Sequence, residues 1–283
     1  MNHQEGFFRN AQNLQIYHQS WLPEDEPVAV FMLIHGLAEH SGRYSNVVNH
    51  FVPRGYAIYS HDHIGHGKSE GTRLYVERFQ DFLDPLKTYY EMIASRHPGK
   101  PIFLAGHSMG GLISATYLLD HQDSFTGAIL SGPSVKVPDH IPPAIITTGK
   151  LLSKVIPKFG LMQLESGGIS RDPAVVQAYI HDPLVSTRKM TARLAAELLN
   201  ATNRIAHDAN KISLPILIVH GGSDRLVEPE GSRSFYNRIQ STDKTIRIYD
   251  GLYHEVFNEP EHEKVLKDVE IWLEKRLTGK AEE

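Results

Sequence analysis

The sequence has no cysteine, no long apolar run and no surplus of basic residues. The lack of cysteine excludes disulfides, thiolate metal sites and a cysteine nucleophile. No stretch approaches the roughly 18 consecutive apolar residues that a membrane-spanning helix needs. The net charge is -4 and no lysine or arginine cluster is long enough to follow a phosphate backbone, so a nucleic-acid partner is not expected.

What the chain does contain is enough apolar material for a substantial core. Hydrophobic residues make up 41% of its 283 positions, which suits one large α/β domain with room for an inserted subdomain. No repeat period is visible. Residues 1–12 are polar and lack the apolar core of a signal peptide, so we expect a cytoplasmic protein.

Short apolar runs of strand length alternate with helical patterns along most of the chain. The expected strands cover residues 14–21, 28–34, 57–60, 102–105, 128–130, 215–220 and 245–249. The expected helices cover residues 45–53, 79–97, 109–119 and 260–278. This alternation predicts the α/β class, with a mostly parallel central sheet flanked by helices and a ligand site at the carboxyl ends of the strands.

The alternation breaks between about residues 135 and 210. Residues 141–157 and 193–204 have helical apolar patterns, with no strand expected between them. We therefore predict a core formed by residues 1–134 and 211–283, and a helical cap insertion, residues 135–210, over the active edge of the sheet. The apolar surface of the cap either packs on the domain beneath it or lines an acyl pocket and leans on a membrane surface, and different faces could do each.

Ser108 lies where an expected strand meets an expected helix. The turn is expected over residues 106–110, which read Gly-His-Ser-Met-Gly. Glycines two residues before and two after the serine allow neighbouring backbones to approach closely, which leaves the hydroxyl exposed on a strained turn. The five-residue pattern is weak alone, but the strand before it and the helix after it make it typical of a hydrolase nucleophile.

A serine hydroxyl needs an imidazole to take its proton and a carboxylate to orient that imidazole. In the hydrolase arrangement the acid and then the histidine follow later strands. Asp224 follows one expected strand and His254 follows the next, so we predict that both act with Ser108. Asp224 could instead be a turn residue, and Asp243 is a rival acid at the wrong end of the last strand.

The oxyanion of the tetrahedral intermediate requires preorganised N–H donors. One should be the backbone N–H of Met109, directly after the nucleophile. The second should be the N–H of Leu37, in the loop after the strand 28–34.

A loop with three histidines follows the strand 57–60. His61, His63 and His66, with Asp62, only loosely match a metal-ligand set and have no further partner nearby in the sequence. We therefore predict no metal, and a structural role for this loop at the rim of the pocket. His107 is expected to pack beside the serine, and His35 to orient its own loop.

With these residues in place, the chain resembles the monoacylglycerol lipase family of α/β-hydrolases over about residues 14–273. The similarity is carried by the stretches HGLAEHSGRY, HDHIGHGKSEG, GHSMGG, SRDPAVVQAYIHDPL, GGSDRL and DKTIRIYDGLYH. The resemblance implies hydrolysis of monoacylglycerol to glycerol and fatty acid without a cofactor. It also implies a cap that forms a hydrophobic tunnel for the acyl chain and touches membranes transiently.

The resemblance implies roles for individual residues as well. Ser108, Asp224 and His254 would be the triad, and Leu37 and Met109 would supply the oxyanion N–H groups. The residues that would surround the glycerol headgroup are Glu39, Arg43 and Tyr179.

Several alternatives remain open at the headgroup end. Phe257 stands where members of the family have a second histidine, which removes a hydrogen-bonding group. Glu39 and Arg43 could instead form an ion pair that shapes their loop, and Tyr179 could pack within the cap. The alternative functions are a lysophospholipase or broad-specificity carboxylesterase with the same triad, and a non-catalytic lipid-binding module.

Overall fold

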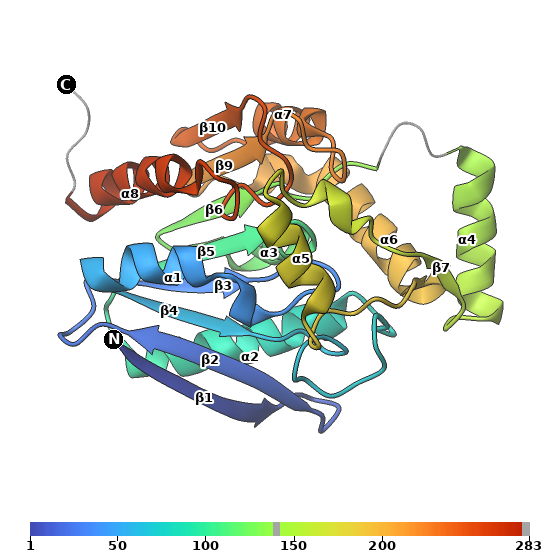
Figure 1. Ribbon diagram of the computed structural model, residues 1–283, viewed down its shortest axis with the longest axis horizontal. Coiled ribbons are helices and arrows are strands. Elements are labelled where there is room, and N and C mark those ends of the chain that lie inside the picture. The colour runs from blue at the N-terminus through green and yellow to red at the C-terminus, as the bar shows by residue number, and fades with distance from the viewer. Residues whose placement is uncertain (138–141, 279–283) are drawn as a thin grey trace.

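A computed structural model describes residues 1–137 and 142–278, and it contains an eight-stranded sheet of order β1-β2-β4-β3-β5-β6-β9-β10 (Figure 1). Strands β1 and β2 pair antiparallel with each other, and β2 pairs antiparallel with β4; all pairings from β4 to β10 are parallel. The strands of this sheet are β1 Asn2–Arg9, β2 Gln15–Leu22, β3 Ala29–Ile34, β4 Tyr56–His61, β5 Ile102–His107, β6 Gly127–Ser131, β9 Ile216–Gly221 and β10 Lys244–Tyr249.

Helices cover both faces of the sheet, as its central strands require. All six residues of β3 are buried, and they alternate between two core clusters, one under each layer of helices. The layer on one face is α1 Ser45–Phe51 and α8 His262–Thr278. The other includes α2 Gln80–Arg96, α3 Met109–His121, α6 Ala192–Asp208 and α7 Pro229–Arg238.

The chain between β6 and β9 forms the region that was expected to be a cap. It contains α4 Pro143–Val155, α5 Pro173–His181 and α6, and α4 packs on α6 at one end of the molecule (Figure 1). Contrary to expectation, two short strands, β7 Gly160–Met162 and β8 Met190–Thr191, pair within it. Strands of three and two residues are too short to produce an alternating pattern. The first residue of the helix expected over 141–157 lies outside the described residues.

The central strands confirm the predicted α/β order, whereas the edges of the molecule differ from it. Strand β1 was not predicted, because it is a polar edge strand in which only Phe8 is buried. Helix α7 was also missed. Near the site, β5 extends through His107 and α3 begins at Met109, so the turn expected over residues 106–110 shrinks to Ser108 alone. Among the described residues, no helix combines the length and the apolar character needed to cross a membrane.

Candidate active site

Ser108 forms the whole corner between β5 and α3. Its backbone has φ 54° and ψ -118°, a region that L-residues avoid. The Ser108 N–H donates to the carbonyl oxygen of Ser131 at 2.9 Å, which ties the corner to the neighbouring strand β6. A Cβ at Gly110 would overlap the carbonyl oxygen of Ile34, and a Cβ at Gly106 would collide with the backbone of Gly110. The two glycines are therefore what allows this strained corner to form.

Asp224 and His254 meet at the carboxyl ends of β9 and β10. The Nδ1 of His254 donates to Oδ2 of Asp224 at 2.6 Å, and both side chains are buried. The other carboxylate oxygen, Oδ1, accepts the N–H groups of Leu226 at 2.8 Å and Val227 at 3.0 Å. The structure therefore brings the two predicted residues together, with the carboxylate held by its own turn. The rival acid, Asp243, pairs instead with Arg276 of α8.

The two groups shift each other's pKa in opposite directions. Burial raises the pKa of Asp224, but the attraction of His254 and the hydrogen bonds it accepts outweigh burial and hold that pKa below its usual value. Burial lowers the pKa of His254, but the charge of Asp224 outweighs it, so the pKa is raised. The Asp224 bond also fixes the His254 tautomer, because a neutral ring that donates from Nδ1 keeps Nε2 as an acceptor.

Ser108 and His254 both line a cavity of about 320 Å³ beneath α4 and α6. They are not hydrogen-bonded to each other; such contacts are often long in unliganded enzymes and tighten when substrate binds. The other walls are mostly apolar. The apolar residues that line it include Leu112, Ile145, Ile146, Leu161, Met162, Leu164, Met190, Leu198, Leu199 and Val227. Ser108 and His254, the predicted nucleophile and base, thus line a space whose walls are mostly apolar but also include the charged residues Lys136, Lys150 and Glu228.

The two predicted N–H donors also belong to this cavity. Leu37 and Met109 both line it, and neither N–H donates to another group in the described part of the chain. The loop of Leu37 is well fixed: the N–H of Gly36 donates to Oε1 of Glu39 at 2.7 Å, and Ala38 has a left-handed φ of 65°. Two unpaired N–H groups beside a serine are suited to bind an oxyanion.

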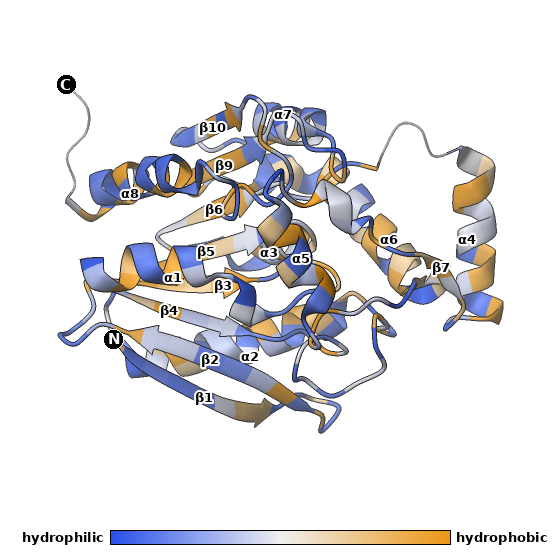
Figure 2. Ribbon diagram, viewed as in Figure 1, coloured by the Kyte–Doolittle hydropathy of each residue, from blue (hydrophilic) through white to orange (hydrophobic). Residues whose placement is uncertain are grey.

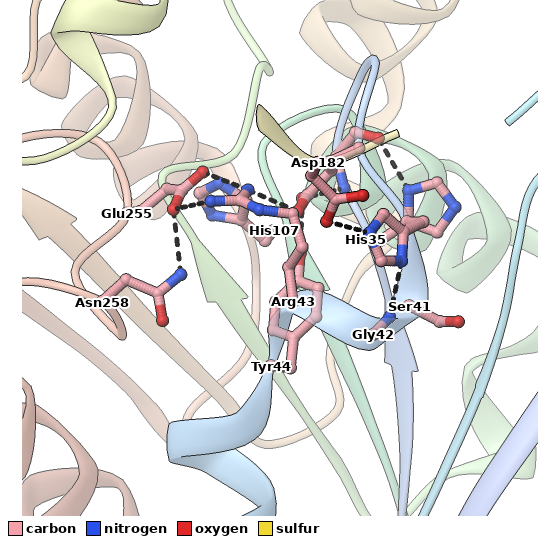
Figure 3. Close-up of polar contacts among 12 residues, drawn as sticks. His35, Ser41, Gly42, Arg43, Tyr44, His107, Asp182, Glu255 and Asn258 are labelled. Carbon is pink, nitrogen blue, oxygen red and sulfur yellow. Dashed lines mark hydrogen bonds and ion pairs between the residues drawn. The ribbon is translucent and has the colours of Figure 1, made fainter. Parts of the chain in front are cut away.

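A buried ion network joins this loop through Glu39, and Figure 3 shows the pair between Arg43 and Glu255 at its centre. Arg43 makes a bidentate pair with Glu255, with Nη1 2.6 Å from Oε1 and Nη2 2.9 Å from Oε2, and Nη1 is also 2.9 Å from Oε2 of Glu39. Its guanidinium lies over the ring of Tyr179 at 4.6 Å. Burial raises the pKa of Glu39, whereas Arg43 outweighs burial at Glu255 and lowers its pKa. The network links the loop of Leu37 to the residue that follows His254.

Glu39, Arg43 and Tyr179, the residues expected at the headgroup, therefore lie together but do not line the 320 Å³ cavity. Their contacts match the alternative of an ion pair that shapes the loop. A headgroup role stays a prediction for all three. Phe257 is buried beside Glu39 at a small space that also borders Tyr44 and Glu255.

The loop that contains His61, His63 and His66 is hydrogen-bonded to the segment after β3. His63 donates its backbone N–H to Nε2 of His35 at 2.9 Å, and Asp62 accepts the N–H and the hydroxyl of Ser41. Within residues 1–137 and 142–278, no three His, Cys, Asp or Glu side chains are grouped so that they could hold a metal. His107 packs beside the serine, with its ring 4.6 Å from that of His254.

Two buried residues that touch the site were missed from the sequence. Glu255 directly follows His254, and a charge beside an expected catalytic residue was a signal that could have been used. His220 lies 3.0 Å from Asp224 Oδ2 and gave no signal, because it ends an apolar run that reads as an ordinary buried strand.

Comparisons with known proteins show the family to which the chain belongs. The family described as "Serine aminopeptidase, S33" matches residues 25–261. A monoacylglycerol lipase of Mycolicibacterium smegmatis is 37% identical over 96% of this chain and 98% of its own length, and a monoglyceride lipase of Homo sapiens is 32% identical over 94% and 89%. The crystal structure of a monoacylglycerol lipase from Paleococcus ferrophilus is 29% identical and superimposes with a TM-score of 0.82, covering 98% of this chain and 100% of that one. The chain thus has the α/β-hydrolase fold and belongs to the monoacylglycerol lipase family of serine hydrolases.

Proposed function

We propose that this protein hydrolyses the ester bond of monoacylglycerols to give glycerol and a free fatty acid. The observation that carries the proposal is that the strained Ser108 lines the same mostly apolar cavity as His254, which is hydrogen-bonded to Asp224. An acyl chain suits the mostly apolar walls of this cavity. The names of the relatives point to the same substrate class.

In the proposed reaction, Ser108 Oγ attacks the ester carbonyl while His254 Nε2 takes its proton. The N–H groups of Leu37 and Met109 stabilise the oxyanion, and Asp224 stabilises the imidazolium. His254 then protonates the departing glycerol alkoxide and leaves an acyl-enzyme. A water molecule activated by His254 releases the fatty acid and restores Ser108. These steps require only groups of the chain and water.

We also propose that residues 135–210 act as a cap that holds the acyl chain. Side chains of α4, β7 and α6 line the cavity opposite Ser108, which supports this division of the chain. Helix α4 and the segment after it also expose large apolar side chains to solvent, and their ribbon carries orange, hydrophobic stretches in Figure 2. Those that do not also line the cavity are Leu151, Val155, Ile156 and Phe159. Such a surface supports transient contact with the surface of a lipid membrane.

For the headgroup we propose that Glu39, Arg43 and Tyr179 surround the glycerol moiety. None of the three lines the 320 Å³ cavity, and the support for this role is the buried hydroxyl of Tyr179, which has no hydrogen-bond partner in the described part of the chain. Because Arg43 is already paired with two carboxylates, it offers little attraction to an anionic headgroup. This favours an uncharged glycerol over a phosphate-bearing one.

The test is to compare hydrolysis of a monoacylglycerol and a lysophosphatidylcholine of equal chain length. A clear preference for the monoacylglycerol, abolished by Ser108→Ala, is the expected result. Preference for the charged headgroup would instead make the protein a lysophospholipase. If the wild type turned over no ester while Ser108→Ala still bound lipid, the protein would be a lipid-binding module.

A further inference from the structure

His220 is a buried histidine that has no role in the proposed reaction. It lies near the end of β9, four residues before Asp224, and its side chain is fully buried. Its Nε2 is 3.0 Å from Asp224 Oδ2 and 3.0 Å from the carbonyl oxygen of Val227. An ionised carboxylate and a carbonyl can only accept hydrogen bonds, so Nε2 carries the proton and donates it toward both.

The second ring nitrogen fixes the orientation of His220. Nδ1 is 2.7 Å from Oγ of Ser232, a buried residue of α7. Since a neutral imidazole has one donor and one acceptor nitrogen, Nδ1 accepts the Ser232 hydroxyl. The ring is therefore held in one tautomer by groups from α7 and from the turn after β9.

The consequence is that two imidazoles share one carboxylate oxygen. Asp224 Oδ2 accepts from His254 at 2.6 Å and from His220 at 3.0 Å. The other oxygen, Oδ1, is held by the N–H groups of Leu226 and Val227, so the backbone already orients the carboxylate. The bond from His220 is thus not needed to aim Asp224, and it acts on the charge that Oδ2 presents to His254.

Building on the proposed function, we infer that His220 is a positioning residue that sets the basicity of His254 through the shared oxygen of Asp224. A hydrogen bond donated to Oδ2 stabilises the carboxylate charge there, so His254 gains less proton affinity from Asp224 than it would from an oxygen with no second donor. His254 therefore keeps a larger unprotonated fraction, the form that acts as the base.

The other charged groups around His254 do not replace this effect. Glu255 and Glu39 both raise the pKa of His254, and both pair with Arg43. The ring of His107 packs against His254 at 4.6 Å, and burial lowers the pKa of His107 to about 3, so it is neutral near pH 7. None of these groups is hydrogen-bonded to His220. The change in the basicity of His254 should therefore depend on the hydrogen bond between His220 and Asp224.

The experiment compares His220→Met, which removes the donor, with His220→Gln, whose side-chain N–H can take the place of Nε2. We expect His220→Met to move the acidic limb of the kcat/KM profile, measured on a monoacylglycerol, upward by about half a pH unit, a part of what one hydrogen bond can supply. His220→Gln should keep the wild-type limb. NMR titration of His254 through its Nδ1 proton should show the same shifts without relying on turnover.

The matched control is His97→Met, which removes another buried imidazole with one side-chain partner, Tyr59, far from Asp224. This control should leave the acidic limb of the kcat/KM profile at its wild-type pH.

If His220→Met fails to fold, His220→Asn serves in its place, because the shorter amide stays near Ser232 and cannot reach Asp224. An unmoved or lowered limb without the donor, or an equal shift in the His97 variant, would overturn the inference. A wild type inactive on every ester would contradict the proposed function instead, and the titration of His254 would still decide the role of His220.

Discussion

Different interactions hold the floor of the cavity and the helices above it: hydrogen bonds and ion pairs in the floor, and apolar contacts in the helices. The floor comprises the lining residue His254 together with the residues beneath it, Asp224, Glu39 and Glu255, which are buried and do not themselves line the cavity. Each of the four takes part in hydrogen bonds or ion pairs of 2.6–3.0 Å. Above it, α4 presents apolar side chains to the cavity and to solvent, with Leu151 62% exposed and Val155 69% exposed. Buried polar networks hold one geometry, whereas apolar contacts have no direction and accept many shapes. The contrast suits a floor that performs fixed chemistry under a surface that accommodates flexible acyl chains.

The strongest test of the floor is to remove the two groups that we propose react, Ser108 and His254. Ser108→Ala and His254→Ala should each lower kcat by about 10⁶-fold, the loss seen when one member of such a unit is deleted. Steady-state hydrolysis of a monoacylglycerol measures this, with circular dichroism to confirm that the fold is kept. Substantial residual activity in either variant would mean that another pair of residues performs the reaction.

A smaller loss is expected when the acid alone is changed. Asp224→Asn keeps the shape of the side chain but favours the wrong tautomer of His254, so kcat should fall by about 10⁴-fold. The same assay checks this. An active Asp224→Asn enzyme would point to a different acid, with Asp243→Asn as the first variant to examine.

The ion network should show how much the buried charges of the floor matter to stability. Arg43→Met leaves Glu39 and Glu255 without their cation, and breaking a buried pair in this way typically lowers the free energy of unfolding by about 3–5 kcal/mol. Urea denaturation measures the change. The double variant Arg43→Met, Glu255→Met should recover part of it, because it no longer leaves Glu255 unpaired.

The control for this comparison is Arg193→Met, which breaks the more exposed pair with Glu77. Surface pairs contribute about 0–1 kcal/mol, so this variant should differ little from the wild type. If the Arg43 and Arg193 variants lost the same free energy of unfolding, the buried ion pairs of the floor would contribute no more to stability than an exposed pair.

The raised pKa of His254 predicts how activity depends on pH. His254 must be unprotonated to act as a base, so kcat/KM should fall as the pH drops through its folded-state pKa. Because Asp224 raises that pKa above the usual 6.5, the acidic limb should lie above pH 6.5. A pH–rate profile on a short-chain ester tests this, and a limb below 6.5 would mean that burial outweighs the Asp224 charge.

The sequence predicts the parts of the site whose cause is local. Ser108 could be found because its corner needs Gly106, Gly110, a strand and a helix within a few residues, and the order of Asp224 and His254 follows from the order of the strands. Glu255 and Arg43 could not be paired from the sequence, because 212 residues separate them. The role of His220 depends on the placement of Ser232 by α7, a helix that the pattern did not reveal. Strand β1 was missed because most of its side chains are exposed at the edge of the sheet, so few of its residues are apolar.

The smallest effect on the fold is expected from the outer surface of α4. Leu151 and Val155 are mostly exposed, so the double variant Leu151→Ser, Val155→Ser should change the free energy of unfolding by only about 0.5 kcal/mol. If these side chains enter a lipid surface, each should add roughly 1.5 kcal/mol or more to binding, so the double variant should bind vesicles of neutral phospholipid about 100-fold more weakly. Vesicle sedimentation measures this, with hydrolysis of a dissolved short-chain ester as the readout for the floor. The matched control is Ile271→Ser, which removes an exposed apolar side chain from α8 and should not weaken vesicle binding. If the double variant bound vesicles normally, the apolar side chains of α4 would not bind membranes. The difference between the floor and α4 would then matter only for holding the acyl chain in the cavity.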